Sequence, residues 1–131
     1  MNNILAAAQA KGIDIYIGMY FDETWNTMNK DLQSNYDQVL AKHKVVIDEI
    51  HGLFGSNPQF KGWYIPQEID DLNWQSNSRQ TMLANWLQQT AAYAKAKDAN
   101  KKIMIAPFFG LFMPADVLKS FGISFELTVV S

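Results

Sequence analysis

Carboxylates lie at the ends of two apolar segments of this chain, and aromatic residues lie close to both. Asp22 directly follows IDIYIGMYF (13–21), and Glu68 ends FKGWYIPQE (60–68). A carboxyl group can transfer a proton or bind a hydroxyl group, and an aromatic ring can pack against the C–H surface of a sugar ring. These residue types therefore favour a carbohydrate site, on the condition that the fold brings the two segments together.

Strand-like and helix-like patterns alternate along the chain. Apolar residues at a spacing of three and four predict helices, and runs that are apolar on both faces predict parallel strands. The expected elements are helices over 4–10, 34–54 and 78–98 and strands over 13–21, 60–68 and 101–109. Ser34 or Asn35 is the expected cap of the second helix. Single helices between strands imply right-handed crossovers and a parallel sheet.

The predicted fold class is therefore α/β, with about three to four parallel strands that alternate with helices. Residues 1–131 are expected to form one domain. The pattern is clear over 1–113 and atypical over 114–131. In that tail, 115–120 is expected to be a short helix and 123–130 a strand.

The first two strands have one mainly aliphatic face and one face with tyrosine, glycine and acid. The second kind of face carries Tyr16, Gly18, Tyr20 and Asp22 in the first strand and Gly62, Tyr64, Pro66 and Glu68 in the second. The aliphatic faces suit packing against helices, and the other faces suit the interior of a barrel.

The two acids are then expected to point into one mouth at the carboxyl ends of the strands. The aromatic residues expected around this mouth are Trp25, Trp74, Phe108 and Phe109. Trp25 and Trp74 are candidate stacking platforms for a sugar. Tyr20 and Tyr64 are candidates to donate hydrogen bonds into the cleft, and filling of the barrel interior is the alternative for both.

Each acid also has a purely structural interpretation. Glu68 is either a general acid or nucleophile in the cleft, or a loop carboxylate paired with Arg79. Asp22 is either the partner carboxylate or a turn residue that accepts hydrogen bonds from its own backbone. Asp70 is a candidate for substrate binding, but Asp70 and Asp71 more simply shape their loop. No Gly-punctuated calcium loop is present, so no metal is expected.

The composition excludes several classes of protein. The 11 basic and 13 acidic residues are scattered, which argues against a nucleic-acid partner. The lack of cysteine excludes disulfides and thiolate sites, and no glycine-rich phosphate loop follows a strand, so no cofactor is expected. His43 is expected to be a packed helix residue. No run approaches the ~20 apolar residues of a membrane span, and the first residues do not form a signal peptide, which leaves the localisation open.

Three segments of the chain resemble a known bacterial family. GIDIYIGMYFDETW, GWYIPQEIDDLNW and KKIMIAPFF together resemble domain of unknown function family 4434, a TIM-barrel group related to glycoside hydrolases. The resemblance covers about residues 1–113. It implies an eight-stranded barrel with a carbohydrate-directed cleft, in which Glu68 is the acid. A full barrel takes about 250 residues, so by this resemblance residues 1–131 correspond to about half of one. The resemblance thus implies a single incomplete domain with the fold of part of a TIM-type (β/α) barrel.

The activity implied for a complete barrel is hydrolysis of a glycosidic bond in an oligosaccharide or polysaccharide by paired carboxylates, here Glu68 and Asp22. Two other interpretations remain open. A non-catalytic carbohydrate-binding module needs the aromatic residues and not the acid. A truncated domain that is inert on its own exposes its strand edges and is expected to form a homo-oligomer or to aggregate.

Overall fold

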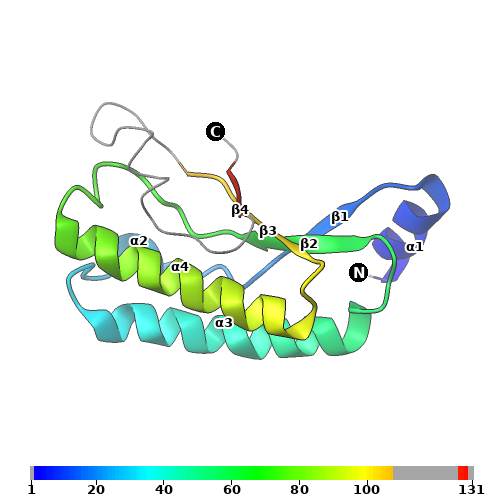
Figure 1. Ribbon diagram of the computed structural model, residues 1–131, viewed down its shortest axis with the longest axis horizontal. Coiled ribbons are helices and arrows are strands. Elements are labelled where there is room, and N and C mark those ends of the chain that lie inside the picture. Colours follow the sequence, from blue (N-terminus) through cyan, green and yellow to red (C-terminus); the bar gives the residue numbers. More distant parts are fainter. Residues whose placement is uncertain (1, 108–126, 130–131) are drawn as a thin grey trace.

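A computed structural model of the chain describes residues 2–107 and 127–129 (Figure 1). The elements are, in order, α1 (Asn2–Lys11), β1 (Ile15–Gly18), α2 (Thr24–Thr27), α3 (Gln33–Phe54), β2 (Phe60–Ile65), α4 (Asn77–Lys97), β3 (Lys102–Ile105) and β4 (Leu127–Val129). The predicted alternation of helices and strands is confirmed. The strands are shorter than predicted, because the paired segments end before the apolar runs do.

The four strands form one parallel sheet in the order β1-β2-β3-β4. The sheet is open, and the described strands do not close into a barrel. This confirms a partial β/α fold with parallel strands. The strand expected over 123–130 is present as β4, whereas the helix expected over 115–120 lies outside the described residues.

The two faces of the sheet differ as the sequence predicts. Buried hydrophobic residues on or just after the strands share one core with α3 and α4; they are Ile17, Met19, Phe60, Trp63, Ile65, Ile103 and Ile105. Phe60, at the start of β2, is the even-numbered member of this set. These two helices lie together on one side of the sheet (Figure 1). On the opposite face Tyr16, Tyr64 and Met104 are only partly buried.

Gly62 is required by close packing on that opposite face. A Cβ atom at this position would lie 2.5 Å from the Lys102 carbonyl oxygen and 2.5 Å from the Tyr16 ring. Any side chain there would push Tyr16 away or separate β2 from β3. The glycine therefore lets an aromatic ring lie directly over the strand.

The two long helices differ at their starts, because α4 has a side-chain cap and α3 has none. Ser76 accepts a hydrogen bond from the Arg79 N–H at the start of α4, at 3.2 Å. The helix α3 begins at Gln33 after Leu32, without a side-chain cap, so the prediction of Ser34 or Asn35 as its cap was wrong. The Asn35 amide instead donates to the Asn29 carbonyl at 2.9 Å. None of the helices in the described part of the chain is both long and apolar enough to cross a lipid bilayer.

Candidate functional site

The candidate site lies where β1 and β2 end, because ligands of parallel sheets bind at the carboxyl ends of the strands. Two loops meet there, residues 19–32 after β1 and residues 66–76 after β2. The loop after β1 contains the short helix α2, which the sequence pattern did not predict. Hydrogen bonds between these loops decide which side chains face solvent.

Glu68 combines a fixed main chain with an exposed side chain. Its neighbours Gln67 and Ile69 are both 2% exposed, so both side chains point into the protein, and Glu68 points the other way. The Trp25 indole N–H donates to the Glu68 carbonyl at 2.7 Å. The Glu68 carboxylate has no hydrogen bond or ion pair with another described residue. Pairing with Arg79, the structural alternative, does not occur.

Asp22 occupies a different environment. Its carboxylate is buried, pairs with Lys42 on α3 at 2.8 Å, and accepts hydrogen bonds from the Thr24 hydroxyl at 2.6 Å and the Thr24 N–H at 3.0 Å. These hydrogen bonds, the one from Lys42 first, hold the pKa of Asp22 below its ordinary value. Asp22 is therefore an ionised turn residue directed towards α3. The prediction that it shares an open mouth with Glu68 was wrong.

Trp25 and Trp74 are core residues. They are 1% and 0% exposed, and their rings stack on each other with centroids 5.6 Å apart. Trp25 also packs against Trp86 of α4, with ring centroids 4.6 Å apart. The prediction that these two tryptophans offer stacking platforms to a ligand was therefore wrong. They support the two loops from inside.

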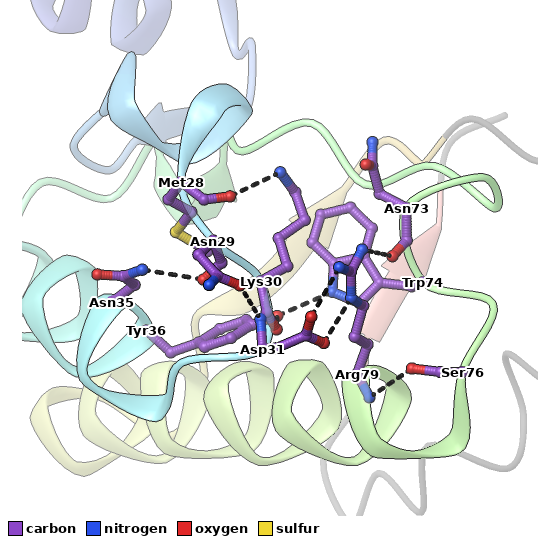
Figure 2. Close-up of polar contacts among 10 residues, drawn as sticks. All are labelled: Met28, Asn29, Lys30, Asp31, Asn35, Tyr36, Asn73, Trp74, Ser76 and Arg79. Carbon is purple, nitrogen blue, oxygen red and sulfur yellow. Dashed lines mark hydrogen bonds and ion pairs between the residues drawn. The ribbon is translucent and has the colours of Figure 1, made fainter.

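Figure 2 shows how the polar groups of the two loops are joined. The Trp74 indole N–H donates to the Tyr36 hydroxyl at 3.2 Å, and that hydroxyl donates to the Lys30 carbonyl at 2.9 Å. Arg79 binds both carboxylate oxygens of Asp31, at 2.8 and 2.9 Å. Its third contact is with the Asn73 carbonyl, at 2.9 Å. The helix α4 therefore holds both loops through one guanidinium group.

Lys30 is buried within this cluster. Its ammonium group donates to the Asn26 and Met28 carbonyls at 3.3 and 3.5 Å and lies 5.6 Å from the centroid of the Trp74 ring. Burial lowers the pKa of this group. Lys30 thus binds carbonyl groups at the end of α2 and packs near the buried Trp74 ring.

Asp70 also has a structural role. Its two oxygens accept hydrogen bonds from the Asn73 N–H at 2.6 Å and the Asn73 side-chain amide at 2.7 Å. The carboxylate therefore shapes the loop after β2, which was one of the two interpretations of this residue. Asp71 is buried. Among the described residues, no three acids or histidines form a group that could hold a metal ion.

The exposed aromatic residues at this edge differ from those predicted. Tyr20 and Phe21 are 40% and 46% exposed, and Tyr64 is partly buried on the face of the sheet opposite α3 and α4. The Lys42 ammonium group lies 5.4 Å from the centroid of the Tyr20 ring. Phe21 was not singled out from the sequence, because its odd position placed it on the aliphatic face. Phe108 and Phe109 lie outside the described residues.

A buried histidine links these loops to α3. His43 is fully buried, accepts a hydrogen bond from the Tyr20 N–H at 3.2 Å and bonds to the Gln67 side chain at 2.9 Å. Burial lowers its pKa to about 4. The prediction of a packed helix histidine is confirmed. Its two partners lie 23 and 24 residues away, and no local pattern in the sequence identifies them.

Comparison with known proteins places this chain in a family. The sequence profile described as "Domain of unknown function (DUF4434)" matches residues 1–125. The chain belongs to this family. It is also similar to the uncharacterized protein YbcH of Escherichia coli strain K12, with 29% identity over 113 residues. These residues are 85% of this chain and 38% of that protein, so the chain spans well under half of the relative. No solved structure matches the chain significantly.

Proposed function

We propose that the carboxyl edge of this sheet is part of a carbohydrate site in which Glu68 contacts the bound sugar. The observation that carries the proposal is an exposed carboxylate on a fixed main chain, without a partner among the described residues. The buried side chains of Gln67 and Ile69 flank Glu68, and the Trp25 indole holds its carbonyl. A group that is already positioned loses little conformational freedom when a ligand binds.

Exposed aromatic residues next to this acid support the same ligand class. Tyr20 and Phe21 expose large parts of their rings directly after β1. Tyr64 lies on the face opposite α3 and α4, on the same strand-and-loop segment as Glu68. Aromatic faces take the C–H surface of a sugar, and phenol and carboxylate groups take its hydroxyls. In this proposal Tyr20 and Phe21 take the stacking role that the buried tryptophans cannot take.

Hydrolysis of a glycosidic bond is the proposed reaction, with Glu68 as proton donor or nucleophile. It needs a second carboxylate about 5–5.5 Å away for retention or about 6.5–9.5 Å away for inversion. Asp22 and Asp70 are both engaged in structural hydrogen bonds. The second acid is therefore neither Asp22 nor Asp70, which leaves the exposed Glu23 in the loop after β1 or an acid outside the described residues.

Non-catalytic carbohydrate binding is the second candidate function. The engagement of Asp22 favours it for this chain by itself, because binding needs no second acid. The two candidates differ in what they require of Glu68. Catalysis is lost when the carboxylate becomes an amide, whereas stacking on Tyr20 and Phe21 is retained.

The test is calorimetric titration of the chain with cellohexaose, xylohexaose, chitohexaose and maltohexaose, together with an assay for released reducing ends. We expect one of these sugars to bind and Tyr20→Ala to weaken its binding at least about tenfold, as for loss of a stacking ring. Glu68→Gln should abolish any hydrolysis. Glu49→Gln is the matched control, because Glu49 is also exposed but lies on α3. Equal binding by wild type and Tyr20→Ala would refute the proposed site.

A further inference from the structure

Three residues form a closed ring of hydrogen bonds where β1 and β2 end. The Tyr20 N–H donates to His43 Nδ1 at 3.2 Å, and the Gln67 side-chain amide donates to the Tyr20 carbonyl at 2.7 Å. His43 Nε2 and Gln67 Oε1 complete the ring at 2.9 Å. The ring connects the end of each strand to α3. It therefore controls the spacing of the two loops that carry Tyr20 and Glu68.

The ring allows only one protonation state of the imidazole. Nδ1 accepts the Tyr20 N–H, so the single proton of neutral His43 must lie on Nε2, from which it is donated to Gln67. A second proton on Nδ1 would face the Tyr20 N–H, and two donors cannot bond to each other. Protonation of His43 therefore breaks the ring at Tyr20.

The charge state of His43 depends on the groups that the neighbouring elements place around its imidazole ring. Asp22, in the loop after β1, favours the imidazolium form, but its carboxylate is paired with Lys42. The side chain that α4 presents is the uncharged Trp86, with its ring centroid 5.6 Å from that of His43. The segment after β2 presents Gln67, and the neighbouring Glu68 is exposed to solvent. Burial outweighs the charge of Asp22, so the neutral form prevails at neutral pH.

We propose that the His43–Gln67–Tyr20 ring is a positioning device for the candidate site, which acid opens. With His43 neutral, the ring holds the Tyr20 main chain against Gln67 and thereby fixes the neighbouring Glu68. With His43 protonated, Tyr20 loses its acceptor on α3, and the loop after β1 is no longer held to that helix at Tyr20. The consequence for sugar binding rests on the proposed function, whereas the coupling between His43 and the loops does not.

The first test is an NMR titration of the ¹⁵N-labelled chain from neutral pH to about pH 3, which extends below the expected His43 midpoint. The imidazole nitrogens should report the Nε2–H form at neutral pH. The Tyr20 and Glu68 amides should then shift with the same midpoint as the His43 ring. In His43→Asn, whose side-chain oxygen still offers an acceptor to the Tyr20 N–H, this transition should vanish. His51→Asn is the matched control and should leave it unchanged.

A second variant keeps the proposal testable if the wild type unfolds before His43 titrates. Gln67→Glu places a carboxylate on Nε2–H, which stabilises the imidazolium form and moves the midpoint to a higher pH. It also removes the amide that donates to the Tyr20 carbonyl, so the readout in this variant is the Tyr20 N–H, whose bond to Nδ1 is retained while His43 is neutral. The Tyr20 amide must follow the ring to this new midpoint, while amides of β3 stay unchanged. A His43 titration that leaves the Tyr20 and Glu68 amides unmoved overturns the proposal.

The sugar experiments separate this proposal from the proposed function. If no hexaose binds any variant, the carbohydrate site is refuted, and the NMR coupling still decides about the ring. If a hexaose binds with equal affinity above and below the His43 midpoint of Gln67→Glu, the site exists and its positioning by the ring is refuted. A loss of affinity that follows this midpoint supports both.

Discussion

Acidification from pH 7 to pH 5 is expected to lower the free energy of unfolding of this chain by about 2 kcal/mol. The reason is His43, which burial keeps neutral in the folded state, with its pKa lowered from 6.5 to about 4. Between these two values the unfolded chain binds more protons than the folded one. The stabilising contribution is therefore complete above about pH 6.5 and is lost as the pH falls towards 4.

The magnitude follows from the size of the shift. A shift of this size corresponds to about 3 kcal/mol in total, since one pKa unit is about 1.4 kcal/mol. About two thirds of this amount is lost by pH 5. The carboxyl groups with lowered pKa values, among them Asp22 and Asp31, release their contributions only below their ordinary pKa of 3.8. The change in the free energy of unfolding between pH 7 and pH 5 therefore reports on His43 and not on these carboxyl groups.

The assay is urea unfolding followed by far-ultraviolet circular dichroism at several pH values. Circular dichroism is preferred because an imidazolium ion beside Trp86 would itself change the indole fluorescence. His51→Asn should keep the slope of stability against pH, and His43→Asn should flatten it. A wild-type chain whose slope equals that of His43→Asn would refute the assignment of a buried neutral imidazole.

Three further predictions concern stability and are measured by the same urea unfolding at pH 7. Trp74→Phe should lower the free energy of unfolding by about 1 kcal/mol more than Trp63→Phe does. The reason is that the Trp74 indole N–H has an acceptor, whereas that of Trp63 has none among the described residues. Equal losses would contradict this prediction. Lys101→Met should lower the free energy of unfolding by about 2–3 kcal/mol, because the buried Lys101 ammonium group bonds to two carbonyls and one carboxylate. Lys61→Met, at an exposed lysine, is the control and should have almost no effect. Similar losses in the two variants would contradict the prediction. Asp22→Ala should lower the free energy of unfolding by about 1–2 kcal/mol. Asp22→Asn should lower it by less than half of that, because the amide oxygen still accepts the hydrogen bonds of the turn. The reverse order would refute the turn role of Asp22.

The fold could be predicted largely from the sequence because its signals are local. The alternation in the first two strands separated the buried Ile17, Met19, Trp63 and Ile65 from the partly buried Tyr16 and Tyr64 on the other face. It did not predict that Phe60 is buried or that Ile13 is exposed. Parallel pairing followed from the single helices between strands. The turn role of Asp22 also had a local signal, since Thr24 two residues later is suited to an Asx turn.

The candidate site was predicted less well because its contacts are long-range. Trp25 and Trp74 follow strands in polar segments, as ligand-binding aromatic residues do, and nothing local shows that their rings stack on each other in the core. The partner of Asp22 is Lys42, on the next long helix. The ring through His43 and Gln67 depends on how α3 lies against the end of β2. Such contacts follow from tertiary packing and not from spacing along the chain.

The most direct test of the central claim is amide chemical-shift mapping of the chain with the sugar that binds best among the four hexaoses. The largest changes should occur at Tyr20, Phe21 and Glu68, at the carboxyl ends of β1 and β2. Leu53→Ala, at the end of α3 that precedes β2, should leave the map unchanged, because Leu53 is also exposed but lies at the amino ends of the strands. Changes centred on the amino ends of the strands, or no change with any of the four sugars, would contradict the account.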